Sequence, residues 1–175
     1  YFSPQIWCSD DTDAIERLAI QESTALMYPL SVIGAHVSDC PNHTVGRVTP
    51  FKTRGIIAMA GTFGYELDVT KIPEEDRDMI ASQVETYKKY CPLIQSGDYY
   101  RIASYQNNHY FDCYEIVSKD KKEAIFVFVQ VIAQPNMHSI RVKLKGLDNE
   151  AKYKINGTVY DADALMNGGF IIKRP

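Results

Sequence analysis

The sequence lacks features that several classes of protein require. No apolar run approaches the roughly 18 residues of a membrane span, and no basic region precedes an apolar one at the start, so no signal peptide is visible. A basic stripe is missing too: the formal net charge is -3, with acidic residues interspersed among the basic ones. We therefore expect no nucleic-acid or membrane partner. The chain begins at Tyr1 rather than Met, and we expect it to be a piece of a longer polypeptide.

Cysteine is scarce, and its spacing favours neither a metal site nor a disulfide framework. A chain of this size with a full set of core residues does not need disulfides, so we predict free thiols in a reducing compartment and a cytoplasmic protein. His36, Cys40 and His43 fall close together, but no fourth ligand stands at a usual spacing. We predict no metal and no cofactor. The four cysteines are Cys8, Cys40, Cys91 and Cys113.

What the sequence does contain is an acidic stretch, Trp7–Asp13, with one tryptophan and three aspartates in seven residues. The apolar run at residues 1–7 predicts a strand, and the pattern that follows predicts a helix over residues 13–27. Asp13 and Glu16 have the spacing of a capping box, so Asp13 is predicted to cap that helix. A carboxylate between a strand and a helix is where barrel enzymes place their chemistry. The alternative is a polar loop with a capping residue, because Asp is favoured there for local reasons.

The remainder of the first half predicts mainly helices. A short apolar stretch at residues 30–35 leads into a polar loop, and residues 54–63, rich in Ala and Gly, predict a closely packed helix. A further helix is predicted to begin at Pro73 and to stop at Pro92. On the first helix, Arg17 is expected away from the apolar side.

From Gly97 onward the pattern changes to short β-type runs separated by turn residues. Residues 124–132 are apolar on both sides, as expected of a central strand, and Asn156-Gly157 is a strong hairpin signal. We predict an antiparallel β-sandwich and place the boundary near residues 95–98, which gives domains of residues 1–96 and 97–175. The predicted strands are residues 99–102, 110–117, 124–132, 139–144 and 153–155.

A series of specific motifs runs in unbroken order through most of the first hundred residues, and weaker ones follow. They are Trp-Cys-Ser-Asp-Asp-Thr-Asp-Ala (7–14), Met-Tyr-Pro-Leu (27–30), Gly-Ala-His-Val-Ser (34–38), Pro-Asn-His (41–43), Gly-Arg-Val-Thr-Pro (46–50), Thr-Arg-Gly (53–55), Gly-Thr-Phe-Gly-Tyr-Glu-Leu-Asp (61–68), Leu-Lys-Gly-Leu-Asp (144–148) and Leu-Met-Asn-Gly-Gly (165–169). Together they resemble the family 36 glycoside hydrolases, the microbial α-galactosidases. The resemblance implies an α/β part that is the C-terminal end of a (β/α)8 TIM barrel, its last strand and helices, followed by an all-β antiparallel β-sandwich domain.

The resemblance also implies a retaining α-galactosidase, which removes terminal α-linked galactose from substrates such as melibiose or raffinose. Such an enzyme uses two carboxyl groups roughly 5 to 5.5 Å apart, and the resemblance assigns the acid/base role to Asp10. An acid of this kind is helped by an apolar wall and a neighbouring carboxylate. Trp7 is the candidate for the wall and for a flat face against the sugar, and Asp11 for the charge. The alternatives are that Trp7 belongs to the barrel core, that Asp11 faces water, and that Ser9 braces the loop rather than touches substrate.

One part of the catalytic machinery is missing from the sequence. The family's nucleophilic aspartate lies in a Lys-x-Asp motif on an earlier barrel strand, and no such motif occurs here in a suitable setting. We therefore expect this chain alone to be inactive, with a galactoside as the substrate of the longer protein. The resemblance further implies a homo-oligomer, commonly a tetramer.

Two other functions remain open from the sequence. An α-N-acetylgalactosaminidase or a transferase of the raffinose-synthase type would differ in pocket residues that this chain does not contain. A non-catalytic carbohydrate-binding or oligomer-assembly module is suggested by the aromatic second half. Exposed, coplanar rings would favour sugar binding, whereas buried ones would favour a structural role. The rings are those of Tyr99, Tyr100, Tyr105, Tyr110, Phe111 and Tyr114.

Overall fold

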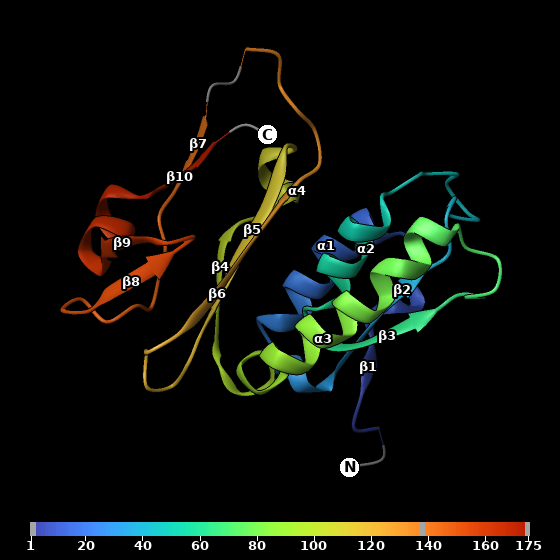
Figure 1. The fold of residues 1–175 in the computed structure, drawn as a ribbon, viewed down its shortest axis with the longest axis horizontal. Coiled ribbons are helices and arrows are strands. Elements are labelled where there is room, and N and C mark those ends of the chain that lie inside the picture. Colours follow the sequence, from blue (N-terminus) through green and yellow to red (C-terminus); the bar gives the residue numbers. More distant parts are fainter. Residues whose placement is uncertain (1–2, 137–138, 174–175) are drawn as a thin grey trace. The chain divides into compact units, whose positions relative to one another are not determined.

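A computed structural model of the protein describes residues 3–136 and 139–173 (Figure 1). The chain divides into two compact units, unit 1 at Tyr1–Ser96 and unit 2 at Gly97–Pro175. No helix within the described ranges is both long and apolar enough to cross a membrane.

Unit 1 is a parallel α/β structure. Its three strands form one sheet in the order β1-β2-β3, and an α-helix follows each strand. The helix α2 contacts both α1 and α3, and Figure 1 shows the three helices side by side. The elements are β1 (Ile6–Trp7), the 3₁₀ turn η1 (Cys8–Asp10), α1 (Ala14–Ala25), η2 (Leu30–Val32), β2 (Ile33–Ser38), α2 (Phe51–Ala58), β3 (Thr62–Glu66) and α3 (Glu74–Ser96).

Asp13 begins α1 as predicted. One oxygen of its carboxylate accepts hydrogen bonds from the backbone N–H groups of Ile15 and Glu16, both at 3.0 Å. The reciprocal bond of a capping box is absent from the described hydrogen bonds, because the N–H of Asp13 donates to Asp11 at 2.9 Å instead. The prediction about Arg17 is wrong: its side chain is fully buried.

One predicted element of unit 1 is wrong, and two strands were not predicted. The expected helix over residues 54–63 ends at Ala58, and Thr62–Glu66 form β3 instead. A Cβ at Gly61 would lie 2.5 Å from the carbonyl oxygen of Ile33, so glycine lets β3 start close to β2. Together with β2 at residues 33–38, this gives three parallel strands where the sequence predicted one last strand.

Two further boundaries differ from the prediction. The strand expected over residues 1–7 is confined to Ile6–Trp7, and residues 1–2 lie outside the described ranges. The helix α3 continues through Pro92 to Ser96, although proline cannot donate to the carbonyl one turn earlier. Leu93 and Ile94 are buried, and this burial holds the last turn in place.

Unit 2 is built from antiparallel strand pairs throughout the part that the structure describes. The strands β4, β5 and β6 form one sheet in that order, β7 pairs with β10, and β8 pairs with β9. The Asn156-Gly157 hairpin is confirmed, with positive φ at both residues as a tight primed turn requires. The elements are β4 (Asp98–Ala103), α4 (Tyr105–Asn108), β5 (Phe111–Val117), β6 (Ala124–Gln130), β7 (Ser139–Val142), β8 (Lys152–Ile155), β9 (Thr158–Asp161), the π-helical turn η3 (Ala164–Gly168) and β10 (Phe170–Lys173).

The central strand of the three-stranded sheet is β5, and not the strand at residues 124–132 as predicted. In the described sheet β6 has one partner, β5, whose residues from Asp112 to Val117 are all buried. Side chains of β6 alternate between the two faces of the sheet, and apolar residues on both faces are covered. Phe126 and Phe128 pack on the core of unit 2, and Val129, on the other face, is also buried. An apolar pattern on both faces therefore does not identify a central strand here.

Candidate active site

The carboxyl ends of the three parallel strands meet at one edge of the sheet in unit 1, and acidic residues follow each of them. Asp10 follows β1 in the turn η1, Asp39 follows β2, and β3 ends at Glu66. In α/β folds this edge is where substrates bind. The sequence therefore places the acidic stretch Trp7–Asp13 at the edge best suited to chemistry.

Asp10 is exposed on a turn whose preceding residues are anchored on two sides. Cys8 is buried and its thiol donates to the hydroxyl of Thr24 on α1 at 3.5 Å. Ser9 is fully buried, and its hydroxyl is hydrogen-bonded to Nδ1 of His36 on β2 at 2.6 Å. Of the two roles left open for Ser9, the structure therefore gives it the bracing one. Asp10 projects from an anchored turn with its own side chain exposed.

The three aspartates of the stretch divide by their partners. Asp11 accepts the N–H of Asp13, and Asp13 is buried, caps α1 and forms an ion pair with Arg47. The side chain of Asp10 has no hydrogen bond or ion pair to any residue that the structure describes. The loop-and-cap alternative accounts for Asp11 and Asp13, but it leaves Asp10 without a local function.

The loop that follows β2 is fastened to the acidic stretch. Asn42 donates from Nδ2 to the hydroxyl of Thr12 at 2.9 Å, and its Oδ1 accepts the N–H groups of Thr44 and Val45. Arg47 joins the same loop to Asp13 and lies 3.6 Å from Glu16. The two loops at this edge therefore hold each other in place.

Trp7 lies beside the Asp10 turn with 54% of its surface exposed. Its ring covers Gly34, where a Cβ would lie 2.8 Å from the indole Cδ1. The ring also meets His36 edge-on, with centroids 5.3 Å apart, and Nε1 donates to Gln5 at 3.2 Å. Within the described part of the chain Trp7 is thus held in orientation without being buried, as a sugar-facing ring requires.

Two buried arginines, neither of them selected from the sequence, bind the carboxyl end of β2. Arg17 on α1 donates to the carbonyl of His36, and Arg54 on α2 donates to the carbonyl of Ser38 at 2.5 Å. Because β1 ends opposite Gly34, no residue of β1 pairs with β2 beyond that point. Burial lowers the pKa of Arg17 to about 10, which the nearby carboxylates of Asp11, Glu66 and Asp13 partly oppose. The only available signal was an arginine within a helix that packs on the sheet.

No group of three or more His, Cys, Asp or Glu residues that could hold a metal ion occurs among the described residues. His36 is bonded to Ser9, and Nδ1 of His43 lies 3.4 Å from the hydroxyl of Thr12. All four cysteines are free thiols.

A pocket of about 470 Å3 lies near the same edge of unit 1, between the loop after β2 and the starts of α2 and α3. Its lining includes Asp39, Phe51, Lys52, Arg54 and Asp76. Neither Trp7 nor Asp10 lines it. This pocket therefore does not include the Asp10 turn.

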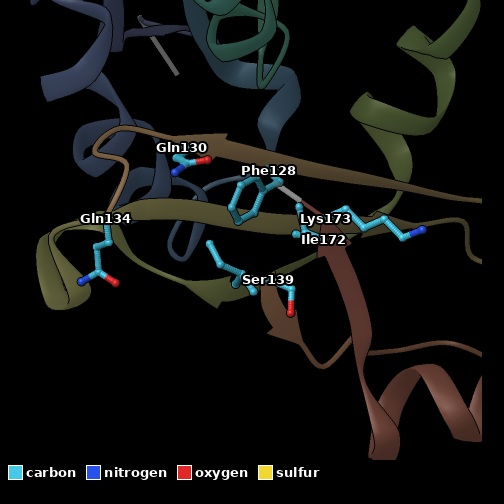
Figure 2. Close-up of a pocket in the computed structure, with 7 residues that line it drawn as sticks. Phe128, Gln130, Gln134, Ser139, Ile172 and Lys173 are labelled. Atoms are coloured by element: carbon cyan, nitrogen blue, oxygen red, sulfur yellow. The ribbon is translucent and has the colours of Figure 1, made fainter. Parts of the chain in front are cut away.

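One pocket of the second unit is too small for a sugar. A pocket of about 20 Å3, lined by residues of β6, β7 and β10, has space for roughly one water molecule (Figure 2). Figure 2 shows Phe128 at its centre and the side chain of Lys173 running away from that ring. Phe128 is stacked on Phe111 at 5.2 Å, so the aromatic lining is engaged in packing.

Most of the aromatic rings considered for a binding module also pack against other residues. Tyr114 is buried, Tyr99 lies 5.4 Å from it, and Tyr100 packs on the core of unit 2. Burial raises the pKa of Tyr114, with Asp112 adding to the effect. Tyr110 is exposed, at 37%. This arrangement favours the structural role over sugar binding.

Parallel βα units with carboxylates at their carboxyl edge define an α/β protein of the kind that carries its chemistry there. Comparison with known proteins gives the family. Residues 1–97 match the Melibiase family, and residues 111–174 match the glycosyl hydrolase family 36 C-terminal domain. The chain belongs to the melibiase family, within the family 36 glycoside hydrolases.

Characterised relatives extend well beyond this chain. The alpha-galactosidase AgaA of Geobacillus stearothermophilus is 47% identical over 171 residues, which are 97% of this chain and 23% of AgaA. The bifunctional alpha-galactosidase/sucrose kinase AgaSK of Mediterraneibacter gnavus is 45% identical over 97% of this chain and 18% of its own length. The crystal structure of AgaA matches with a TM-score of 0.94 at 45% identity, over 100% of this chain and 24% of that one. The chain therefore spans about a quarter or less of these relatives.

Proposed function

We propose that the protein to which this chain belongs is a retaining α-galactosidase, and that Asp10 is its acid/base residue. One observation carries the proposal: of the three aspartates after β1, only Asp10 is exposed at the carboxyl edge without a local partner in the described structure. The names of AgaA and AgaSK, both alpha-galactosidases, support the choice of substrate.

In this mechanism Asp10 acts twice. As an acid it protonates the glycosidic oxygen while the nucleophilic carboxylate attacks the anomeric carbon, and as a base it then takes a proton from the water that releases galactose. Trp7 presents its exposed face to the sugar and excludes water on that side. The nucleophile lies in a part of the protein that this chain does not contain.

The same proposal covers the architecture. Three βα units with a parallel sheet suit the last three strands of a (β/α)8 barrel, and antiparallel pairs around one core suit a β-sandwich. A barrel completed by earlier strands would place both carboxylates in one site. The chain by itself is therefore inactive, and turnover of a galactoside by the purified 175-residue chain would contradict this.

The test compares Asp10→Asn with wild type in the full-length protein, on melibiose and on an aryl α-galactoside whose leaving group needs no proton. We expect kcat/KM on melibiose to fall by about 10² to 10⁴ while kcat/KM on the aryl substrate falls far less. Added azide should restore kcat on the aryl substrate, because azide attacks the galactosyl-enzyme without a general base.

Asp68→Asn is the matched control, because an asparagine there still accepts the N–H of Thr70. It should keep the wild-type ratio of kcat/KM between the two substrates. Equal losses on both substrates in Asp10→Asn, or the same ratio in the two variants, would remove Asp10 from the acid/base role. Adding an α-N-acetylgalactosaminide and a sucrose acceptor to the substrate panel separates the two related activities, and analytical ultracentrifugation tests the proposed homo-oligomer.

A further inference from the structure

We propose that His36 is a positioning residue that fixes both the Asp10 turn and the Trp7 ring. The inference rests on the proposed function and goes beyond it, because His36 acts on the reaction through two other residues. Its location in the middle of β2, with one contact to Ser9 and one to Trp7, carries the argument.

The first contact reaches Asp10 through the backbone. The Ser9 hydroxyl and Nδ1 of His36 are 2.6 Å apart, and Ser9 is the residue that immediately precedes Asp10. Ser9 is fully buried, so its hydroxyl has no access to water as a substitute partner. Loss of the imidazole would leave that hydroxyl unpaired and free the turn to shift.

The second contact reaches Trp7. The imidazole meets the indole edge-on, at 5.3 Å and 62° between planes. Gly34 makes room for the indole, and Gly64 does the same for the imidazole, since a Cβ there would lie 2.7 Å from Cδ2 of His36. The two rings therefore lie in a row across the sheet, each above a glycine of a neighbouring strand.

His36 can position its neighbours because its own backbone is held from both sides. On one side β2 pairs with β3, with His36 opposite Gly64. Its carbonyl accepts a hydrogen bond from the buried Arg17. Alternation along β2 puts His36 on the opposite face from Ile33, Ala35 and Val37, which are fully buried.

The consequence for catalysis is specific to proton transfer. A general acid displaced by about 1 Å can lose on the order of 10²-fold in rate, while a leaving group that needs no proton is insensitive to its position. Loosening of Trp7, by contrast, weakens sugar binding equally for both kinds of substrate. The ratio of kcat/KM on the aryl substrate to that on melibiose thus reports on Asp10, and the factor common to both substrates reports on Trp7.

The experiment uses four variants of the full-length protein beside Asp10→Asn and a control, and one of the four is the double variant Ser9→Ala/His36→Phe. Ser9→Ala and His36→Phe both remove the hydrogen bond, but His36→Phe keeps a ring against Trp7. His36→Asn keeps a polar atom near the Nδ1 position and loses the ring. His109→Asn, at an exposed residue of unit 2, is the control.

We expect Ser9→Ala and His36→Phe each to raise the ratio about tenfold, and the double variant to raise it no further, because the two changes break one bond. His36→Asn should leave the ratio within about threefold of wild type while lowering kcat/KM on both substrates by a common factor of about five. His109→Asn should change neither quantity.

The outcomes separate this inference from the proposed function. If Asp10→Asn raises the ratio but Ser9→Ala and His36→Phe do not, the positioning role of His36 is wrong and the acid/base assignment stands. If Asp10→Asn leaves the ratio unchanged, the acid/base role of Asp10 in the proposed function is wrong. Should His36→Phe not fold, Ser9→Ala against His36→Asn decides the question, since a merely structural His36 predicts equal ratios in both.

Discussion

The guanidinium of Arg17 on α1 donates a hydrogen bond to the main-chain carbonyl of His36 on β2. Arg17 is fully buried, and its Nε and Nη2 have no hydrogen-bond partner among the described residues. Burying a charge that makes only one hydrogen bond costs a large desolvation free energy. The carboxylates of Asp11, Glu66 and Asp13 offset this cost in part. The bond therefore ties the first helix to the strand that carries His36.

Replacing Arg17 by methionine should destabilise unit 1 by about 2 kcal/mol, since the carbonyl of His36 would be buried without a donor. Hydrogen exchange of the β2 and α1 amides in the full-length protein measures the change as a lower opening free energy. Arg77→Met is the matched control: Arg77 also donates to a carbonyl, that of Ile72 at 3.2 Å, but it is exposed. The control should lose less than about 1 kcal/mol, and equal losses would contradict a special role for the buried arginine.

Replacing Asp13 by alanine should cost about 2 kcal/mol in the stability of α1. The change removes the acceptor for two N–H groups and the partner of Arg47, and capping substitutions of this kind cost about 0.5 to 2 kcal/mol. Asp13→Asn keeps the capping oxygen and should lose less than half as much. The opening free energies of the first α1 amides give both values, and similar losses in the two variants would mean that the charge matters more than the cap.

Local signals in the sequence predicted much of the fold. The cap at Asp13 and the Asn156-Gly157 hairpin follow from chemistry that acts within a few residues, and both are confirmed. The strands β2 and β3 were missed because glycine is common in them, at Gly34 and Gly64, and strand patterns usually exclude it. Their glycines serve contacts with Trp7 and His36, which only the folded chain brings together.

The candidate site was predictable in part. Asp10 and Trp7 were selected through the motif at residues 7–14, and their roles remain proposals. The partners of the acidic stretch, His36 and Arg47, lie 27 and 34 residues away in sequence from Ser9 and Asp13 respectively. No periodicity or spacing rule reaches that far, so contacts of this type are found from structure. Arg17 was misplaced because a charged residue next to an apolar stripe is normally assigned to solvent.

Replacing Gly34 by alanine should impair substrate binding rather than proton transfer. The new Cβ would lie 2.8 Å from Cδ1 of Trp7, which is too close, and the indole must turn away. We expect KM for melibiose to rise about fivefold, or about 1 kcal/mol, with the aryl-to-melibiose ratio of kcat/KM unchanged. Gly168→Ala is the control, because nothing lies within 4 Å of a Cβ there. An unchanged KM in Gly34→Ala would mean that the orientation of Trp7 does not matter for the sugar.

Glu115 makes the stability of unit 2 depend on pH. It is fully buried on β5, where Oε2 accepts the N–H of Lys145 at 2.8 Å and Oε1 has no partner in the described structure. Burial raises the pKa of Glu115 from 4.5 to about 7, and the bond from Lys145 opposes this in part. The folded state therefore holds its proton at a pH where the unfolded chain has already lost it.

The sign of the effect follows from that difference. Below about pH 4.5 both states are protonated and no stability is lost, whereas between about 4.5 and 7 the unfolded state releases its proton first and stability falls. The total loss is about 3 kcal/mol, at 1.36 kcal/mol for each pKa unit. Glu115→Gln still accepts from Lys145 and should remove this slope, while the exposed Glu123→Gln should keep it. Opening free energies of the β5 amides measured from pH 4.5 to 8 decide the point, and a wild-type value that stays level through this window would show that the pKa of Glu115 is not raised in the fold.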